Sequence, residues 1–211
     1  MGRLVGVVPP RAVVGTDGVR IIEGRRERFV SYAQVTAVDC ASEGVWLRRA
    51  EGDVLLRTFA GRAGTAPRAP SMHTLALYHR VREARAVGMG GAVAPGKLAL
   101  LERKGRSVGE WLERLRGLPQ QGDYRQMGLE SDELLRVLLD ARSPVERRVA
   151  AAAALSARDE PGMRERVRIA GAATANPRLR VAIDAVTDER LDEAAIAEAL
   201  ADEESARAAE P

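Results

Sequence analysis

The sequence predicts an α+β protein, in which an antiparallel β-barrel of about seven strands with one capping helix precedes an all-α domain. Two observations support this fold class. Between Leu4 and Phe59, short β-prone runs alternate with the turn pairs Asp17-Gly18, Glu43-Gly44 and Glu51-Gly52. After Phe59 the composition shifts to Ala, Arg, Leu and Glu, which are strong helix formers.

Alternating apolar residues bounded by turns predict the strands. Asp17-Gly18 joins the most clearly marked hairpin, because Asp-Gly tolerates the positive φ angles of tight turns. The expected strands cover residues 4–8, 11–14, 19–22, 27–30, 35–40, 45–48 and 54–59. So small a sheet needs a cover at its open end, and residues 72–87 can supply it. This segment lacks Gly and Pro and carries an apolar stripe at helical spacing.

The first 85 or so residues resemble bacterial pleckstrin-homology-like domains. The matching positions are Asp17-Gly18-Val19-Arg20-Ile21, then Arg28-Phe29-Val30-Ser31-Tyr32 with Val35 and Val38, then Leu47 and Gly52-Asp53-Val54-Leu55-Leu56. The resemblance implies a seven-stranded, helix-capped barrel that binds peptides, partner subunits or the membrane surface. It implies no catalytic group.

Two groups of basic residues are the candidate sites for an anionic ligand or partner. Relatives of the pleckstrin-homology type can bind phosphorylated headgroups through a basic loop between early strands, which implies such a role for Arg25, Arg26 and Arg28. Glu23 and Glu27 lie in the same loop, so a solvated turn is the alternative interpretation. The densest positive cluster in the chain consists of Arg103, Lys104 and Arg106 around Gly105, and Lys97 extends it to a basic group at 97–106.

Glycine-rich residues 88–96 predict a hinge between a barrel domain, 1–87, and a helical domain, 97–200, which an acidic tail, 201–211, follows. Gly91 to Lys97 matches most of a phosphate-binding loop. Leu98 replaces the Ser or Thr that would hold Mg²⁺, and the segment before the loop reads as a helix, so a nucleotide site is not expected.

Capping signals divide the helical domain into segments. Ser107 and Glu110 form a capping box before a helix whose Trp111 is expected in the core. Ser131–Asp140 is a second helix, and a third starts with Ser143 as N-cap and has small residues on every face. Residues 163–173 and 177–186 repeat a pattern of Arg followed by Val or Leu and Ala. They resemble HEAT-type repeats, which implies a compact HEAT-like bundle.

Charge and cysteine content set limits on compartment and chemistry. The net charge is +3, with 11 basic against 4 acidic residues at 61–120 and 13 against 19 at 121–211. The single Cys40 and the lack of any run of about 18 apolar residues predict a soluble cytoplasmic protein. His73 and His79 are six residues apart, which does not place them on one helix face, so no metal site is expected. We expect no cofactor and no enzymatic activity.

The sequence therefore favours a non-enzymatic adaptor that binds protein partners through both of its parts. The main alternative is a peripheral membrane protein that its basic groups recruit to anionic lipid, at about 1 kcal/mol for each residue on a shared face. Nucleic-acid binding is disfavoured because few aromatic residues accompany the basic ones. Exposed edges of an incomplete barrel also permit a homodimer.

Overall fold

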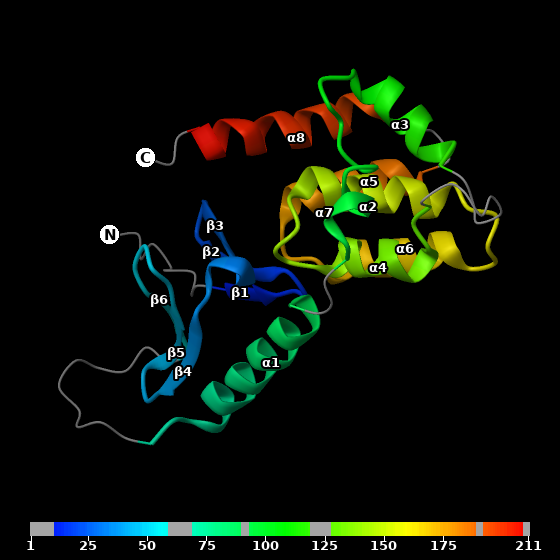
Figure 1. The fold of residues 1–211 in the computed structure, drawn as a ribbon. Coiled ribbons are helices and arrows are strands. Elements are labelled where there is room, and N and C mark those ends of the chain that lie inside the picture. Colours follow the sequence, from blue (N-terminus) through cyan, green and yellow to red (C-terminus); the bar gives the residue numbers. More distant parts are fainter. Residues whose placement is uncertain (1–10, 59–68, 90–92, 119–127, 189–191, 209–211) are drawn as a thin grey trace, which may run out of the picture.

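The computed structural model describes residues 11–58, 69–89, 93–118, 128–188 and 192–208, with side chains as far as Ala201 (Figure 1). Six strands form two three-stranded antiparallel sheets in consecutive order. The first sheet contains β1 (Arg11–Val14), β2 (Gly18–Glu23) and β3 (Arg26–Ser31). The second contains β4 (Ala37–Ala41), β5 (Gly44–Arg48) and β6 (Val54–Arg57).

The prediction of a seven-stranded barrel is wrong, because the described strands form two separate sheets and no closed barrel. The chain leaves β3 through a short 3₁₀ turn, η1 (Tyr32–Gln34), in which the Ser31 hydroxyl accepts a hydrogen bond from the Ala33 amide at 3.2 Å. After this turn β4 does not pair with β3, so the first sheet ends at β3 and a second sheet begins with β4. The seventh expected strand, 4–8, lies outside the described residues.

Asp17-Gly18 forms the expected turn for a different physical reason. Neither residue has a positive φ. A Cβ atom on Gly18 would lie 2.2 Å from the Val30 carbonyl oxygen, so glycine is needed here because the neighbouring strand approaches closely.

Helix α1 (Met72–Gly88) covers the two sheets, as predicted from residues 72–87. Val81 from this helix is fully buried and joins the strand core. That core consists of Val19, Val30, Tyr32, Val35, Val45, Leu47, Val54, Leu56, Val81 and Ala141. We call the sheets and α1 the strand lobe.

The remaining helices form a second body, the helical lobe, in three layers (Figure 1). Helices α5 (Val145–Ser156) and α7 (Pro177–Thr187) make the middle layer. Helices α3 (Val108–Arg116) and α8 (Glu193–Ala208) lie on one side of it, and α4 (Ser131–Leu139) and α6 (Met163–Ala173) lie on the other. A short helix, α2 (Pro95–Leu98), leads into the lobe. Helix α8 continues through the first residues of the expected acidic tail.

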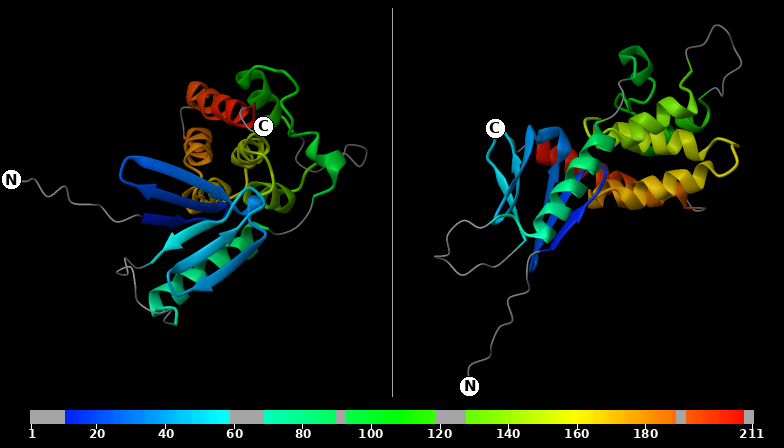
Figure 2. Two further views of the ribbon diagram at one scale, coloured as in Figure 1. Left: turned by 90° about the vertical axis from the view of Figure 1, so that its left-hand side faces the viewer. Right: turned by 90° about the horizontal axis from the view of Figure 1, so that it is seen from below.

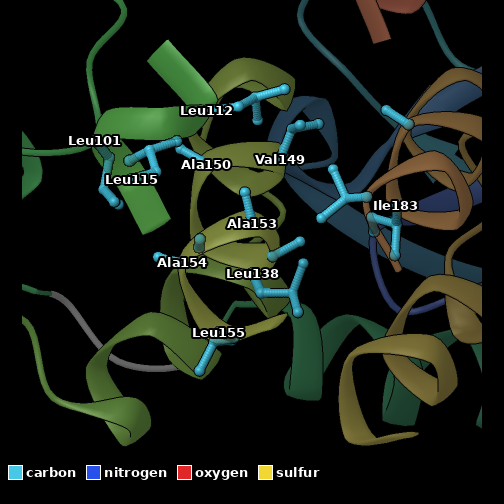
Figure 3. Packing of buried hydrophobic residues seen from close by; sticks show 14 of the residues in the cluster. Leu101, Leu112, Leu115, Leu138, Val149, Ala150, Ala153, Ala154, Leu155 and Ile183 are labelled. Atoms are coloured by element: carbon cyan, nitrogen blue, oxygen red, sulfur yellow. The ribbon is translucent and has the colours of Figure 1, made fainter. Parts of the chain in front are cut away.

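Helix α5 is buried on nearly every side because it lies between the two outer layers. Its residues from Arg148 to Ser156 are all buried, and five consecutive alanines let neighbouring helices approach closely. Leu112 and Leu138 contribute to the same core from opposite outer layers (Figure 3). Trp111 is fully buried and donates a hydrogen bond to the Leu101 carbonyl at 3.0 Å, which confirms it as a core residue.

The turn between β1 and β2 connects the two lobes. The Thr16 amide donates to the Ala173 carbonyl at 2.9 Å, and the Ala141 amide donates to the Gly88 carbonyl at 2.7 Å. Backbones approach so closely here that a Cβ atom on Gly15 would lie 2.3 Å from the Ala175 nitrogen. We call this contact the junction. It holds Gly88, the first residue of the expected hinge, against Thr16.

Asp17 forms the buried centre of the junction. Its carboxylate accepts hydrogen bonds from the Ala175 amide at 2.7 Å and from the Thr174 hydroxyl, and it pairs with the Arg148 guanidinium at 3.2 Å. Arg148 also donates to the Leu138 carbonyl at 2.7 Å. The side chains of Asp17 and Arg148 are 1% and 5% exposed, so the ion pair is almost fully removed from water.

Candidate functional site: a groove between α4 and α6

The first group of sequence-predicted site residues lies on the β2–β3 hairpin. Arg25 occupies the turn after Gly24, and Arg26 and Arg28 follow in β3. All three side chains are exposed. Glu27 on the same strand pairs with Arg20 at 2.8 Å, so one of the acidic neighbours is committed to another partner.

The second group is largely engaged in holding its own loop. The Lys97 ammonium contacts both carboxylate oxygens of Glu133, at 2.7 and 2.8 Å, and so ties α2 to α4. Arg103 donates to the Arg106 carbonyl at 2.6 Å, and Arg106 donates back to the Arg103 carbonyl at 3.2 Å. Lys104, at a positive φ of 51°, forms the exposed tip of this turn.

The two basic groups do not gather on one face. The β2–β3 hairpin and α2 lie at opposite edges of the molecule in the left view of Figure 2. Among the described residues, no cluster of three His, Cys, Asp or Glu side chains could hold a metal ion. None of the described helices has the length and apolar character needed to span a bilayer.

The helical lobe has an apolar groove of about 460 Å³ between α4 and α6. Its apolar lining consists of Leu135, Leu139, Ile169, Ala170 and Ala173, and its charged lining of Asp132, Arg136 and Arg166. We call this surface the α4–α6 groove. The right view of Figure 2, from below, looks onto the layer of α4 and α6 that carries it.

The same spacing on each helix creates the groove. On α4 the lining residues are 132, 135, 136 and 139, and on α6 they are 166, 169, 170 and 173. Both sets follow the pattern i, i+3, i+4, i+7, which places four side chains on one helix face. The two helices thus present parallel stripes to the same groove. Their inner faces pack on the core through Leu134, Val137, Leu138 and Val167, and the lining residues Leu135 and Ala170 also contact that core.

A hydrogen-bond network fixes the width of the groove at the start of both helices. The Arg158 guanidinium, between α5 and α6, donates to the Leu129 carbonyl and to the Ser131 hydroxyl. Ser131 in turn donates to Glu160, just before α6. These contacts place the first residue of α4 beside the segment that leads into α6, so the two helices run in parallel.

The junction fixes the other end of the groove. The Ala173 carbonyl, in the last residue of α6, accepts the Thr16 amide, and Arg148 holds the Leu138 carbonyl near the end of α4. Both walls are therefore tied down at both ends. A groove that is formed before a partner arrives loses less conformational entropy on binding.

Charge and exposure are distributed unevenly along the groove. Ile169 is 60% exposed, although it is a large apolar side chain, and Leu135 and Leu139 are half-buried beside it. Among the described residues, Asp132, Arg136 and Arg166 form no ion pair with one another or with a neighbour. These groups can pair with an incoming partner but supply no arrangement of nucleophile and base, so the groove is suited to binding.

None of the site residues predicted from the sequence lines the groove. A signal was present in α4, where Leu134 and Leu138 repeat at i, i+4 and Leu135 and Leu139 repeat beside them. A helix on the outside of a bundle needs one apolar stripe, which packs on the core. A second apolar stripe on the same helix is more than core packing requires. Only the packing shows that the Leu135 stripe lines a groove, where Leu135 and Leu139 are half-buried.

No protein-family model, curated protein or solved structure matches this chain. The residues and the geometry of the α4–α6 groove are therefore the basis for assigning a function.

Proposed function

We propose that the protein is a non-enzymatic adaptor that binds a partner protein through the α4–α6 groove. The observation that carries this proposal is the groove itself, in which the 60% exposed Ile169 stands beside four other apolar residues. Apolar side chains that gather in one groove favour a binding role, because their burial by a partner is favourable at about 25 cal/mol per Å².

The anatomy of the groove favours a protein over a small molecule. Five apolar residues make up most of the lining, and Asp132, Arg136 and Arg166 add charges, a mixture that is also found in interfaces between proteins. Sites for small molecules are typically concave enough to bury most of the ligand and carry convergent polar groups. This groove is open along its length between two exposed helix faces.

The position of the groove also supports the proposal. The opposite face of α5 and α7 is covered by α3 and α8 (Figure 1), so the α4–α6 layer is an outer layer of the helical lobe. The membrane alternative needs basic groups on a shared face, and the positions of the two groups do not favour it.

The test is site-specific photo-crosslinking of the full chain in the cells that produce it. A photoreactive amino acid replaces Ile169 in one variant and Val181 in a matched control, because Val181 is also a β-branched apolar residue, 51% exposed on the neighbouring helix α7. We expect position 169 to capture one defined protein. A further change, Leu135→Glu, should abolish the capture. Equal adducts at both positions, or none at position 169, would overturn the proposed function.

A further inference from the structure

The charged lining of the α4–α6 groove lies toward one end. Asp132 is the second residue of α4 and Arg136 lies one turn further on, while Arg166 is in the first half of α6. Because α4 and α6 run in parallel, Asp132 and Arg166 lie near the helix starts, and Arg136 lies just past the middle of α4. Leu139 and Ala173, at the helix ends, make the other half apolar.

The charged residues that line the groove carry one more positive than negative charge. These residues are Arg136 and Arg166, with one guanidinium each, and Asp132, with one carboxylate. Among the described residues, none of the three has an ion-pair partner. Both arginines are exposed. A ligand that seats apolar groups between the helices brings its flanks within reach of these guanidiniums, which favour carboxylates.

The spacing of the walls indicates the shape of the ligand. Each wall presents side chains at i, i+3, i+4 and i+7, the pattern that a helix also presents on its own apolar face. Two parallel stripes of this kind accept a third helix, whose apolar residues fill the groove between them. The small side chains of Ala170 and Ala173 leave room for large apolar residues of that helix.

We infer that the occupant of the groove is an amphipathic helix of a partner protein, with apolar residues at i, i+3, i+4 and i+7 and acidic residues flanking one end. This inference rests on the proposed function and adds the chemistry of the partner to it. The apolar stripe supplies the affinity. The acidic flank selects the ligand and fixes its direction, because it pairs with Arg136 and Arg166.

The test uses three labelled synthetic peptides of one length and one apolar stripe, whose flanks carry Glu, Gln or Lys. Fluorescence anisotropy measures the binding of each peptide to the full chain. We expect the Glu peptide to bind about three- to tenfold more tightly than the Gln peptide, since exposed ion pairs are individually weak, and the Lys peptide to bind most weakly. High salt should reduce the differences, because these charges are exposed to solvent.

A charge-reversed protein makes the test decisive. In the variant Arg136→Glu, Arg166→Glu the order of the peptides should invert, so that the Lys peptide binds best. The matched control is Arg180→Glu, on the exposed face of α7 outside the groove lining, which should keep the original order. Circular dichroism confirms that each variant is folded.

The outcomes separate this inference from the proposed function. If all three peptides bind equally and Ile169→Glu abolishes binding, the groove is a docking site but the inference about acidic flanks is wrong. If no peptide binds, or if Ile169→Glu changes nothing, both fail. A homodimer that sedimentation detects in the wild type and that Ile169→Glu dissociates would identify a second copy as the occupant, and would also overturn the inference.

Discussion

Asp17 combines a local role with a long-range one. Its backbone carbonyl accepts the Tyr32 amide at 3.0 Å within the strand lobe, while its side chain reaches Thr174, Ala175 and Arg148 in the helical lobe. A buried carboxylate is tolerated only when its lone pairs are occupied and a positive charge is close. Asp17 meets both conditions, because three donors from three different residues converge on it.

We predict that Asp17→Ala lowers the free energy of unfolding by about 3–5 kcal/mol, because the change leaves the buried Arg148 without its carboxylate. Urea denaturation followed by circular dichroism measures this. Asp39→Ala is the control, since Asp39 pairs with Arg48 on the surface, where its side chain is 51% exposed, and its loss should have little effect.

The double variant Asp17→Ala, Arg148→Met extends this test. Removing both charges together leaves no unpaired buried ion, so its cost should be smaller than the sum of the two single changes. Additive costs would show that the ion pair does not couple the lobes.

At the scale of elements, Glu133 joins two helices with one side chain. It accepts Lys97 from α2, and it also accepts the Glu130 amide at 3.0 Å, which completes a capping box at the start of α4. The hydrogen bond from Lys97 and then that from the Glu130 amide hold the pKa of Glu133 below its ordinary value of 4.5. Both contacts favour the ionised carboxylate.

This lowered pKa sets the direction of a pH dependence. A carboxyl group whose pKa is lower in the folded than in the unfolded state stabilises the fold above its unfolded value, and this contribution is lost as the pH falls through the folded value. We therefore predict that Glu133→Gln is less stable than the wild type at pH 7. The difference should shrink as the pH drops below about 4.5.

Urea denaturation at several pH values checks this prediction. Asp132→Asn, at the neighbouring exposed position, is the matched control, because Asp132 takes part in no ion pair among the described residues. A stability difference between Glu133→Gln and the wild type that stays constant with pH would contradict the assigned contacts.

Local signals in the sequence predict the start of a helix correctly where neighbouring side chains form its cap. The capping box of Ser107 and Glu110 is present, with the Glu110 amide donating to Ser107 at 3.3 Å. The prediction for α5 was wrong in detail, since Pro144 rather than Ser143 is the N-cap and no side chain caps the helix there. The Ser143 hydroxyl instead donates a hydrogen bond to the Asp140 carboxylate at 3.5 Å.

At the scale of the whole molecule, non-local contacts decided what the sequence could not predict. Closure of a barrel depends on which strands pair, and local alternation of apolar residues carries no information about the turn at Tyr32–Gln34 that separates the sheets. The side-chain partners of Asp17 lie more than 130 positions away. The groove was missed for the same reason, because its two stripes become one surface only when α4 and α6 pack on α5.

These long-range contacts lead to a prediction about cooperativity. Gly15 approaches Ala175 so closely that an added Cβ atom would lie 2.3 Å from the Ala175 nitrogen and 2.8 Å from the Ala173 oxygen. Gly15→Ala must therefore push the β1–β2 turn away from the helical lobe, which breaks the junction without changing any charge. The wild type should unfold in one calorimetric transition, because the junction couples the two lobes.

Differential scanning calorimetry of the full chain tests this coupling. We expect Gly15→Ala to show two transitions, or one transition at a lower temperature with a calorimetric enthalpy above the van't Hoff value. Gly96→Ala is the matched control, because no atom lies within 4 Å of its added Cβ, and it should keep the single transition.

The Glu peptide should also bind Gly15→Ala more weakly, since the Thr16–Ala173 hydrogen bond fixes one end of the groove. If Gly15→Ala unfolds like Gly96→Ala and binds the peptide as the wild type does, the junction neither couples the lobes nor shapes the groove.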